Sequence, residues 1–208
     1  MMSMEPPRLS LRERQRQERA RLILQAAEEV LTEKGYHDMS MDEIAARVGV
    51  AKGTVYLHYP SKEDLVVALF ERELDAFLRT VDQILVRQTS ARARLETILH
   101  NLYTGLLGKR MQLLLALYTG MEVRSELLAK KGRLHECLDQ LSGQVTSLLE
   151  EGKANGEFDT SIPTPVMLSA FFSLLSPRSY KRLVVEEQIR PEELVTYLSH
   201  IYFKGILS

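Results

Sequence analysis

The sequence has few of the features that mark secreted or membrane proteins. Cys137 is the single cysteine among 208 residues, which excludes an internal disulfide and fits a reducing compartment. No run of residues is long and apolar enough to span a membrane. The amino-terminal residues are polar and basic, unlike those of a signal peptide. We therefore expect a cytoplasmic protein that makes no membrane contact.

The sequence also lacks the motifs of catalysis. It contains no nucleophile elbow, no phosphate-binding loop and no pair of acids that would form a credible active site. His135, Cys137 and Asp139 lie close together, but on an α-helix Cys137 points away from the other two, and no second cluster supplies further ligands. We therefore expect neither an enzyme nor a metal or cofactor.

The protein has no large excess of charge, since its formal net charge is −1. The charges are unevenly distributed, however, because residues 8–21 hold six arginines against Glu13 and Glu18. Such a basic arm, leading into the first predicted helix, can neutralise phosphates or lie in the minor groove of DNA. A solvated flexible tail explains the same residues equally well.

The most informative segment is residues 40–65. Ser40 and Glu43 have the spacing of a capping box, which satisfies backbone N–H groups at the start of a helix. Gly49 then ends this short helix, where a turn needs a positive φ. The apolar face of the helix comprises Ile44, Ala45 and Val48.

A second short helix is predicted from about residue 51 to residue 56. Val55 would fill the gap between the two helices, and Pro60 prevents the second from continuing. Ser61 and Asp64 then have the spacing of another helix cap. Helix, tight turn and second helix form a helix-turn-helix, a motif that binds DNA. An ordinary three-helix unit would explain any one of these features, but explains the whole set poorly.

This segment resembles the amino-terminal domain of the tetracycline-repressor (TetR) family of bacterial transcriptional regulators. The resemblance covers about residues 17–75. The matching residues are the helix from Gln17 to Glu33, Gly35-Tyr36, Ser40-Met41, Ile44-Ala45, Gly49-Val50, Lys52-Gly53-Thr54-Val55-Tyr56, His58-Tyr59 and Ser61-Lys62.

The resemblance implies a role for each matching position. Lys52, Gly53, Thr54 and Tyr56 would face the major groove, His58 and Lys62 would hold phosphates, and Tyr59 would lie in the core. Leu57 and Pro60 depart from the usual pattern, which leaves a contact of Leu57 open and removes one expected phosphate contact at Pro60. In the family, the remaining helical domain binds a small-molecule inducer and dimerises.

The rest of the chain has helical periodicity, and no strand pattern or internal repeat is present. We predict an all-α protein, with a basic arm over residues 1–16, a helix-turn-helix domain over 17–75, and a ligand-binding and dimerisation domain over 76–208. The predicted helices are 17–34, 61–88, 91–107, 110–118, 124–155, 164–187 with a break at Pro177, and 191–207.

The last two helices have more apolar surface than one subunit needs to bury. Pairing this surface across a twofold axis would give a homodimer with a four-helix interface. The alternative is that these residues only complete the core of one subunit. The candidates are Val166, Phe171, Phe172, Leu175, Leu194, Tyr197, Leu198, Ile201 and Tyr202.

The middle helices contain residues that would suit a cavity for a mostly apolar effector with one or two polar groups. Each of them, taken singly, is also an ordinary core residue. The candidates are His100, Tyr103, Leu107, Met111, Leu114, Leu115, Tyr118, Met121, Cys137, Leu141 and Phe171.

The sequence therefore predicts a homodimeric transcriptional regulator, by resemblance a repressor. It would bind a near-palindromic DNA operator and be released by a small, mostly apolar effector. Two alternatives are a helical partner-binding or architectural protein without specific DNA readout, and an α-helical enzyme that uses His100 or His135 as a base.

Overall fold

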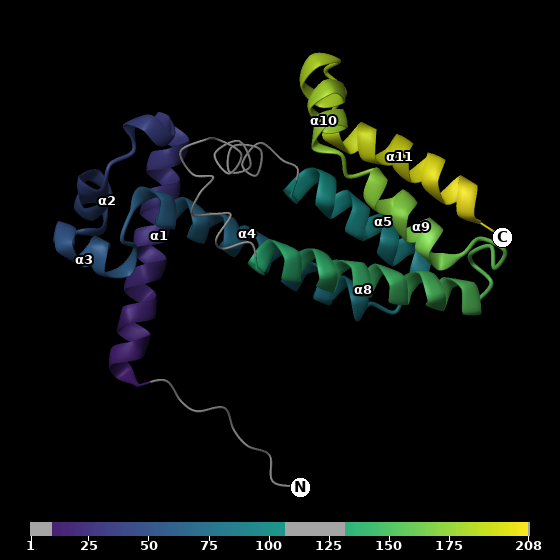
Figure 1. Cartoon of the computed structure of the whole chain (residues 1–208), viewed down its shortest axis with the longest axis horizontal. Helices are drawn as coiled ribbons and strands as arrows, with labels where there is room; N and C mark the ends of the chain where they lie inside the picture. Colours follow the sequence, from purple (N-terminus) through teal and green to yellow (C-terminus); the bar gives the residue numbers. More distant parts are fainter. Residues whose placement is uncertain (1–9, 107–131, 208) are drawn as a thin grey trace, which may run out of the picture. The chain divides into compact units, whose positions relative to one another are not determined.

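A computed structural model describes residues 10–106 and 132–207. The chain forms two compact units, Met1–Leu69 and Phe70–Ser208, and the boundary between them falls within helix α4 (Lys62–Leu85) (Figure 1). The regular elements of the described residues are helices, and strand-like pairing there is limited to an isolated bridge between Phe158 and Leu207. The prediction of an all-α protein is thus confirmed.

The first unit consists of α1 (Leu11–Asp38), α2 (Met41–Val48), α3 (Lys52–His58) and the first two turns of α4. Its core is built from one face of each helix, as the spacing of apolar residues predicts. Among the side chains with 0% exposure are Ile23, Ala27, Val30, Ile44, Val55 and Leu65.

Helix α1 begins well before residue 17, the start expected from the sequence. Ser10 caps it, since the N–H of Glu13 donates to Ser10 Oγ (3.2 Å) and the N–H of Ser10 donates to Glu13 Oε2 (2.7 Å). This is a complete capping box, and it extends the helix into the segment expected to be an arm. The basic residues from Arg12 onward therefore lie on a helix.

Two glycines have the positive φ that their positions require. Gly35 (φ 77°) interrupts the helical backbone near the end of α1, and Gly49 (φ 72°) ends α2 in the left-handed conformation. A side chain at either position would strain the backbone. The turn predicted at Gly49 is confirmed.

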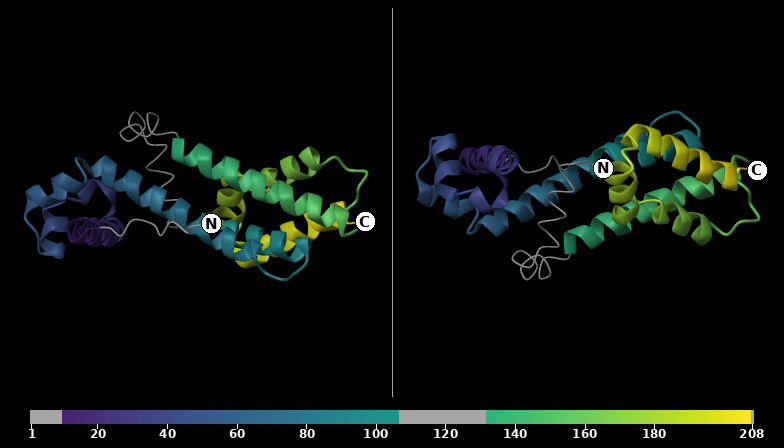
Figure 2. Two further views of the ribbon diagram at one scale, coloured as in Figure 1. Left: turned by 90° about the horizontal axis from the view of Figure 1, so that it is seen from below. Right: turned by 90° about the horizontal axis from the view of Figure 1, so that it is seen from above.

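The second unit packs α8 against α5 and α9, and α11 against α5 and α9 (Figures 1 and 2). The predicted helix 164–187 is interrupted near Pro177, as expected, because α9 ends at Ser173 and a short helix begins at Pro177, followed by a π-helix. The predicted helix 110–118 and the start of helix 124–155 lie outside the described residues. The remaining elements are α5 (Ala91–Asn101), the π-helix η1 (Leu102–Leu106), α8 (Gly132–Ala154), α9 (Thr164–Ser173), α10 (Pro177–Tyr180), the π-helix η2 (Lys181–Glu186) and α11 (Pro191–Ile206).

Polar contacts between distant segments hold the second unit together. The Glu157 carboxylate accepts the N–H groups of Ala91 (3.1 Å) and Arg92 (3.0 Å) and so caps α5 from the loop after α8. Buried Arg94 donates to the carbonyl of Leu85 (3.2 Å) and to the carboxylate of Glu151. These contacts join α5 to the end of α4 and to α8.

The core of this unit is aromatic where α8 ends and α11 passes. Phe158 and Phe203 stack with their ring centres 6.4 Å apart, and both are fully buried. Phe158 lies directly against Gly152, where a Cβ atom would come within 2.2 Å of its ring carbons. The absence of a side chain at Gly152 is therefore a packing requirement. None of the helices in the described residues is apolar over a length sufficient to cross a bilayer.

Candidate nucleic-acid interface

The turn between α2 and α3 is built by local hydrogen bonds. Ser40 Oγ accepts the N–H of Glu43 (3.2 Å) at the start of α2, as predicted. At its end, the N–H of Val50 donates to the carbonyl of Ala45 (3.0 Å). These contacts determine where the chain leaves α2, and hence the direction in which α3 begins.

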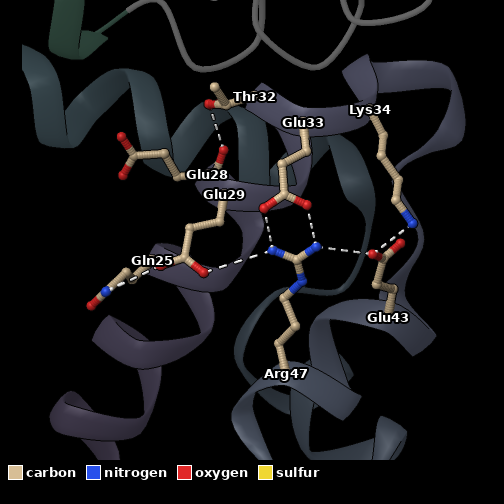
Figure 3. Close-up of polar contacts among 8 residues, drawn as sticks. All are labelled: Gln25, Glu28, Glu29, Thr32, Glu33, Lys34, Glu43 and Arg47. Carbon is tan, nitrogen blue, oxygen red and sulfur yellow. Dashed lines mark hydrogen bonds and ion pairs between the residues drawn. The ribbon is translucent and has the colours of Figure 1, made fainter.

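The second half of the predicted capping box is replaced by ion pairs. The Glu43 carboxylate contacts Lys34 (2.8 Å) and Arg47 (3.1 Å). Arg47 also forms a two-pronged contact with Glu33 and lies 3.8 Å from Glu29 (Figure 3). Hydrogen bonding to Glu33 is the largest of the effects that raise the pKa of Arg47. Arg47 thus joins α2 to α1, and its charge is paired with carboxylates of the same unit.

Helix α3 has one buried face and one exposed face. Val55 is fully buried, as predicted, and anchors the helix on the core. Lys52, Gly53 and Tyr56 are exposed, and Thr54 is half-buried. Leu57, whose role the sequence left open, is 80% exposed and adds an apolar group to the outer surface of α3. Such a group is suited to contact the methyl group of thymine.

Gly53 has no packing role among the residues that the structure describes. A Cβ atom built at this position would meet no atom within 4 Å, and Gly53 is exposed. Glycine within a helix costs about 0.5–1 kcal/mol relative to alanine. The described residues therefore do not require glycine at position 53, and the α3 backbone there is open to close approach by another molecule.

Lys52 forms an ion pair with Asp42 of α2, with its Nζ atom 2.7 Å from Asp42 Oδ2. The hydrogen bond to Asp42 is the main cause of the raised pKa of Lys52, so the ammonium is charged at neutral pH. Both side chains are more than half exposed. An incoming phosphate or base would therefore compete with Asp42 for this ammonium.

The two predicted phosphate ligands are the last residue of α3, His58, and the first residue of α4, Lys62. His58 is half-buried; burial lowers its pKa, and the nearby charges of Arg16 and Arg19 lower it further. The lowered pKa favours the neutral imidazole, which would serve as a hydrogen-bond donor. The ammonium of Lys62 donates to the carbonyl of His37 (3.3 Å) and lies 4.6 Å from the centre of the Tyr36 ring.

Tyr59, predicted to lie in the core, is half-buried at the end of α3. Its hydroxyl reaches the carbonyl of Ala20 on α1 at 3.4 Å. This contact attaches the carboxyl-terminal end of α3 to the middle of α1.

The predicted effector-pocket residues separate into three groups. Tyr103, Cys137, Leu141 and Phe171 are buried in the second unit, whereas His100 is exposed. Burial raises the pKa of Tyr103 to about 12, and its hydroxyl donates to the carbonyl of Leu174. The others, Leu107, Met111, Leu114, Leu115, Tyr118 and Met121, lie outside the described residues.

The predicted dimer residues divide between core and surface. Phe171, Leu194 and Tyr202 are buried within the subunit. Phe172, Leu175 and Leu198 are half-buried. Val166, Tyr197 and Ile201 are 55%, 59% and 65% exposed, on α9 and α11.

A capped helix, a left-handed turn at Gly49 and a second helix with an exposed outer face define a helix-turn-helix DNA-binding protein. Residues 23–69 match the model of the bacterial regulatory proteins of the tetR family. The chain belongs to this family of transcriptional regulators, which are not enzymes.

Relatives extend the similarity beyond the DNA-binding unit. The chain is 28% identical over 153 residues to the fatty acid metabolism regulator protein of Bacillus subtilis, covering 74% of this chain and 77% of that protein. It is 32% identical over 140 residues to the transcriptional repressor KstR of Mycobacterium tuberculosis, and this match covers 67% of this chain and 60% of KstR.

A solved structure has a similar fold over most of the chain. It is the transcriptional regulator FadR of Bacillus subtilis in complex with stearoyl-CoA, with a TM-score of 0.63 and 26% identity. The match covers 90% of this chain and 97% of that one. The similarity therefore includes both units.

Proposed function

We propose that this protein is a homodimeric repressor that binds a near-palindromic DNA operator and is released by a small, mostly apolar effector. The observation that carries the DNA-binding part is Gly53, a helical glycine whose missing side chain the fold does not require. Lys52, Gly53, Thr54 and Tyr56 would face the major groove, and His58 and Lys62 would hold phosphates. A twofold dimer would require half-sites about one helical turn apart, or a multiple of it.

The exposed apolar residues of α9 and α11 support the dimer. Tyr197 and Ile201 are four residues apart and therefore share one face of α11. Together with Val166 they form an apolar surface that a second copy of the chain would cover. Sedimentation analysis of the purified protein tests this, and a monomer at micromolar concentration would contradict it.

For the effector, we propose a long-chain fatty acyl thioester as the first class to test. The support is the similar structure bound to stearoyl-CoA and the buried apolar positions Cys137, Leu141 and Phe171. The acyl chain would occupy apolar surroundings, while the charged CoA part would need polar ligands of its own. To release DNA, the effector must bind more tightly to the state that does not bind the operator.

The test is a fluorescence-anisotropy titration with DNA from upstream of the gene for this protein, and with a scrambled duplex. We expect tighter binding to the upstream fragment, and loss of that binding on addition of stearoyl-CoA but not of free CoA. If no upstream fragment is preferred, selection from random sequence provides the operator. Failure to select any sequence would overturn specific readout and favour the architectural alternative.

Gly53→Ala provides a sharper test of the α3 surface. The substitution should leave the free energy of unfolding unchanged or raise it by up to about 1 kcal/mol, because alanine is the better helix former. Operator affinity should fall at least tenfold, since the added methyl group blocks close approach. A variant that binds the operator as the unmodified protein does would contradict this placement of α3.

A further inference from the structure

One side of α1 changes character along the helix. In the later part of α1 this side is apolar and buried, and in the amino-terminal part it consists of exposed arginines. Positions 12, 16, 19, 23, 27 and 30 follow the helical repeat and so lie along one side of α1. On that side Ile23, Ala27 and Val30 are fully buried against the core. Arg12, Arg16 and Arg19, which we call the arginine stripe, are exposed on the same side where α1 extends beyond α2 and α3 (Figure 1).

This side of α1 faces the end of α3. Tyr59 is the residue at the carboxyl-terminal cap of α3. Its hydroxyl donates to the carbonyl of Ala20, next to Arg19. The charges of Arg16 and Arg19 lower the pKa of His58, the last residue of α3. The arginine stripe therefore begins where the exposed surface of α3 ends.

The stripe is held on an ordered helix. The capping box at Ser10 starts that helix, and its other half is packed in the core, so the exposed turns extend a helix that is already formed. Among the described residues, no carboxylate pairs with the three arginines. On the opposite side of α1, by contrast, Arg21 pairs with Glu18 at 2.6 Å.

We propose that Arg12, Arg16 and Arg19 bind the DNA backbone beside the base pairs that α3 contacts. This inference rests on the proposed function. The stripe spans about 10 Å along the helix at about 1.5 Å per residue. A DNA strand advances about 3.4 Å per phosphate along its axis, so the stripe can reach two or three successive phosphates. The contacts would add affinity without adding sequence preference.

The experiment compares two double variants of the full-length protein. Arg16→Gln/Arg19→Gln removes two charges from the stripe, and Arg14→Gln/Arg21→Gln removes two charges from the opposite side of the same helix. Glutamine is a good helix former, so helix content measured by circular dichroism should stay unchanged. A third variant, Arg16→Lys/Arg19→Lys, keeps the charges in place.

Binding is measured by anisotropy over a range of salt concentrations, with both operator and scrambled duplexes. The stripe variant should bind both duplexes at least tenfold more weakly. The slope of log affinity against log salt should become shallower by about 0.9 for each phosphate that the variant no longer neutralises. The opposite-side variant should change both quantities by less than half as much, and the lysine variant should keep the slope.

The outcomes separate the stripe from the proposed function. The preference of the unmodified protein for its operator over scrambled DNA tests the proposed function. The ratio of the affinity losses of the two glutamine variants, measured on either duplex, tests the stripe. Equal losses in the two variants would show a general effect of net charge and overturn the stripe. Unchanged binding in the stripe variant would overturn it as well, as would an unmodified protein that binds neither duplex.

Discussion

The ion pairs of Arg47 and Lys52 in the first unit and the hydrogen bonds of Arg94 and Tyr202 in the second lie at different depths. In the first unit the ion pairs lie at the surface, as those of Arg47 and Lys52 do. In the second, polar groups are buried and bonded across long stretches of chain, as Arg94 and Tyr202 are. Surface ion pairs contribute about 0–1 kcal/mol, whereas leaving a buried polar group unpaired costs about 1–3 kcal/mol. Single substitutions should therefore affect stability more in the second unit.

The largest effect on stability should come from Gly152→Ala in α8. Its new Cβ atom would lie within 2.2 Å of the Phe158 ring, which is fully buried and cannot move aside freely. Overpacking of this kind destabilises by about 1–3 kcal/mol. The free energy of unfolding of the full chain, measured in urea, should fall by this amount.

Gly143→Ala, in the same helix, is the matched control. A Cβ atom at Gly143 meets nothing within 4 Å, so this variant should be more stable by about 0.5–1 kcal/mol. Equal responses of the two variants would show that the contact between Gly152 and Phe158 has no energetic role.

A smaller loss is expected from Tyr202→Phe. The Tyr202 hydroxyl donates to the carbonyl of Met167 at 2.9 Å in the buried core, and phenylalanine cannot form this hydrogen bond. We expect a loss of about 1–2 kcal/mol, measured as above. Tyr56→Phe, in the first unit, should change stability by less than about 0.5 kcal/mol because Tyr56 is exposed. A larger loss from Tyr56→Phe than from Tyr202→Phe would reverse the comparison between the units.

The smallest effect on stability should follow Asp42→Asn. Loss of the exposed pair with Lys52 should cost no more than about 0.5 kcal/mol. DNA affinity should nevertheless rise severalfold, because no carboxylate then competes with DNA for the Lys52 ammonium. Asp139→Asn, an exposed change of the same charge in the second unit, controls for net charge. An equal rise in affinity for both variants would show that the pair with Asp42 does not restrain Lys52.

The sequence predicted those parts of the first unit that depend on neighbouring residues. Ser40, Gly49 and Val55 each act within a few positions of the feature they determine, so their roles could be inferred from spacing. The capping box at Ser10 has the same local form, and attention to Glu13 three residues later would have revealed it. The ion pair of Glu43 with Lys34 could not be predicted, because Lys34 comes from another helix.

The second unit was less predictable because its decisive contacts join distant positions. Nothing near Ala91 in the sequence indicates that Glu157 caps its helix, and nothing near Gly152 indicates that a ring will cover it. The sorting of apolar residues between core and surface in α9 and α11 likewise depends on packing. Periodicity showed that these helices exist, but not which of their faces is covered.

The cap that Glu157 provides for α5 also has a consequence for synthesis on the ribosome. Domains fold largely as units, with the amino-terminal one first, and residues 1–69 make their core contacts among themselves. The N–H groups of Ala91 and Arg92, in contrast, acquire their partner only after translation has passed Glu157. A nascent chain arrested before that residue would carry a formed helix-turn-helix joined to an α5 that has its Ser90 cap but lacks the carboxylate that binds its first two N–H groups.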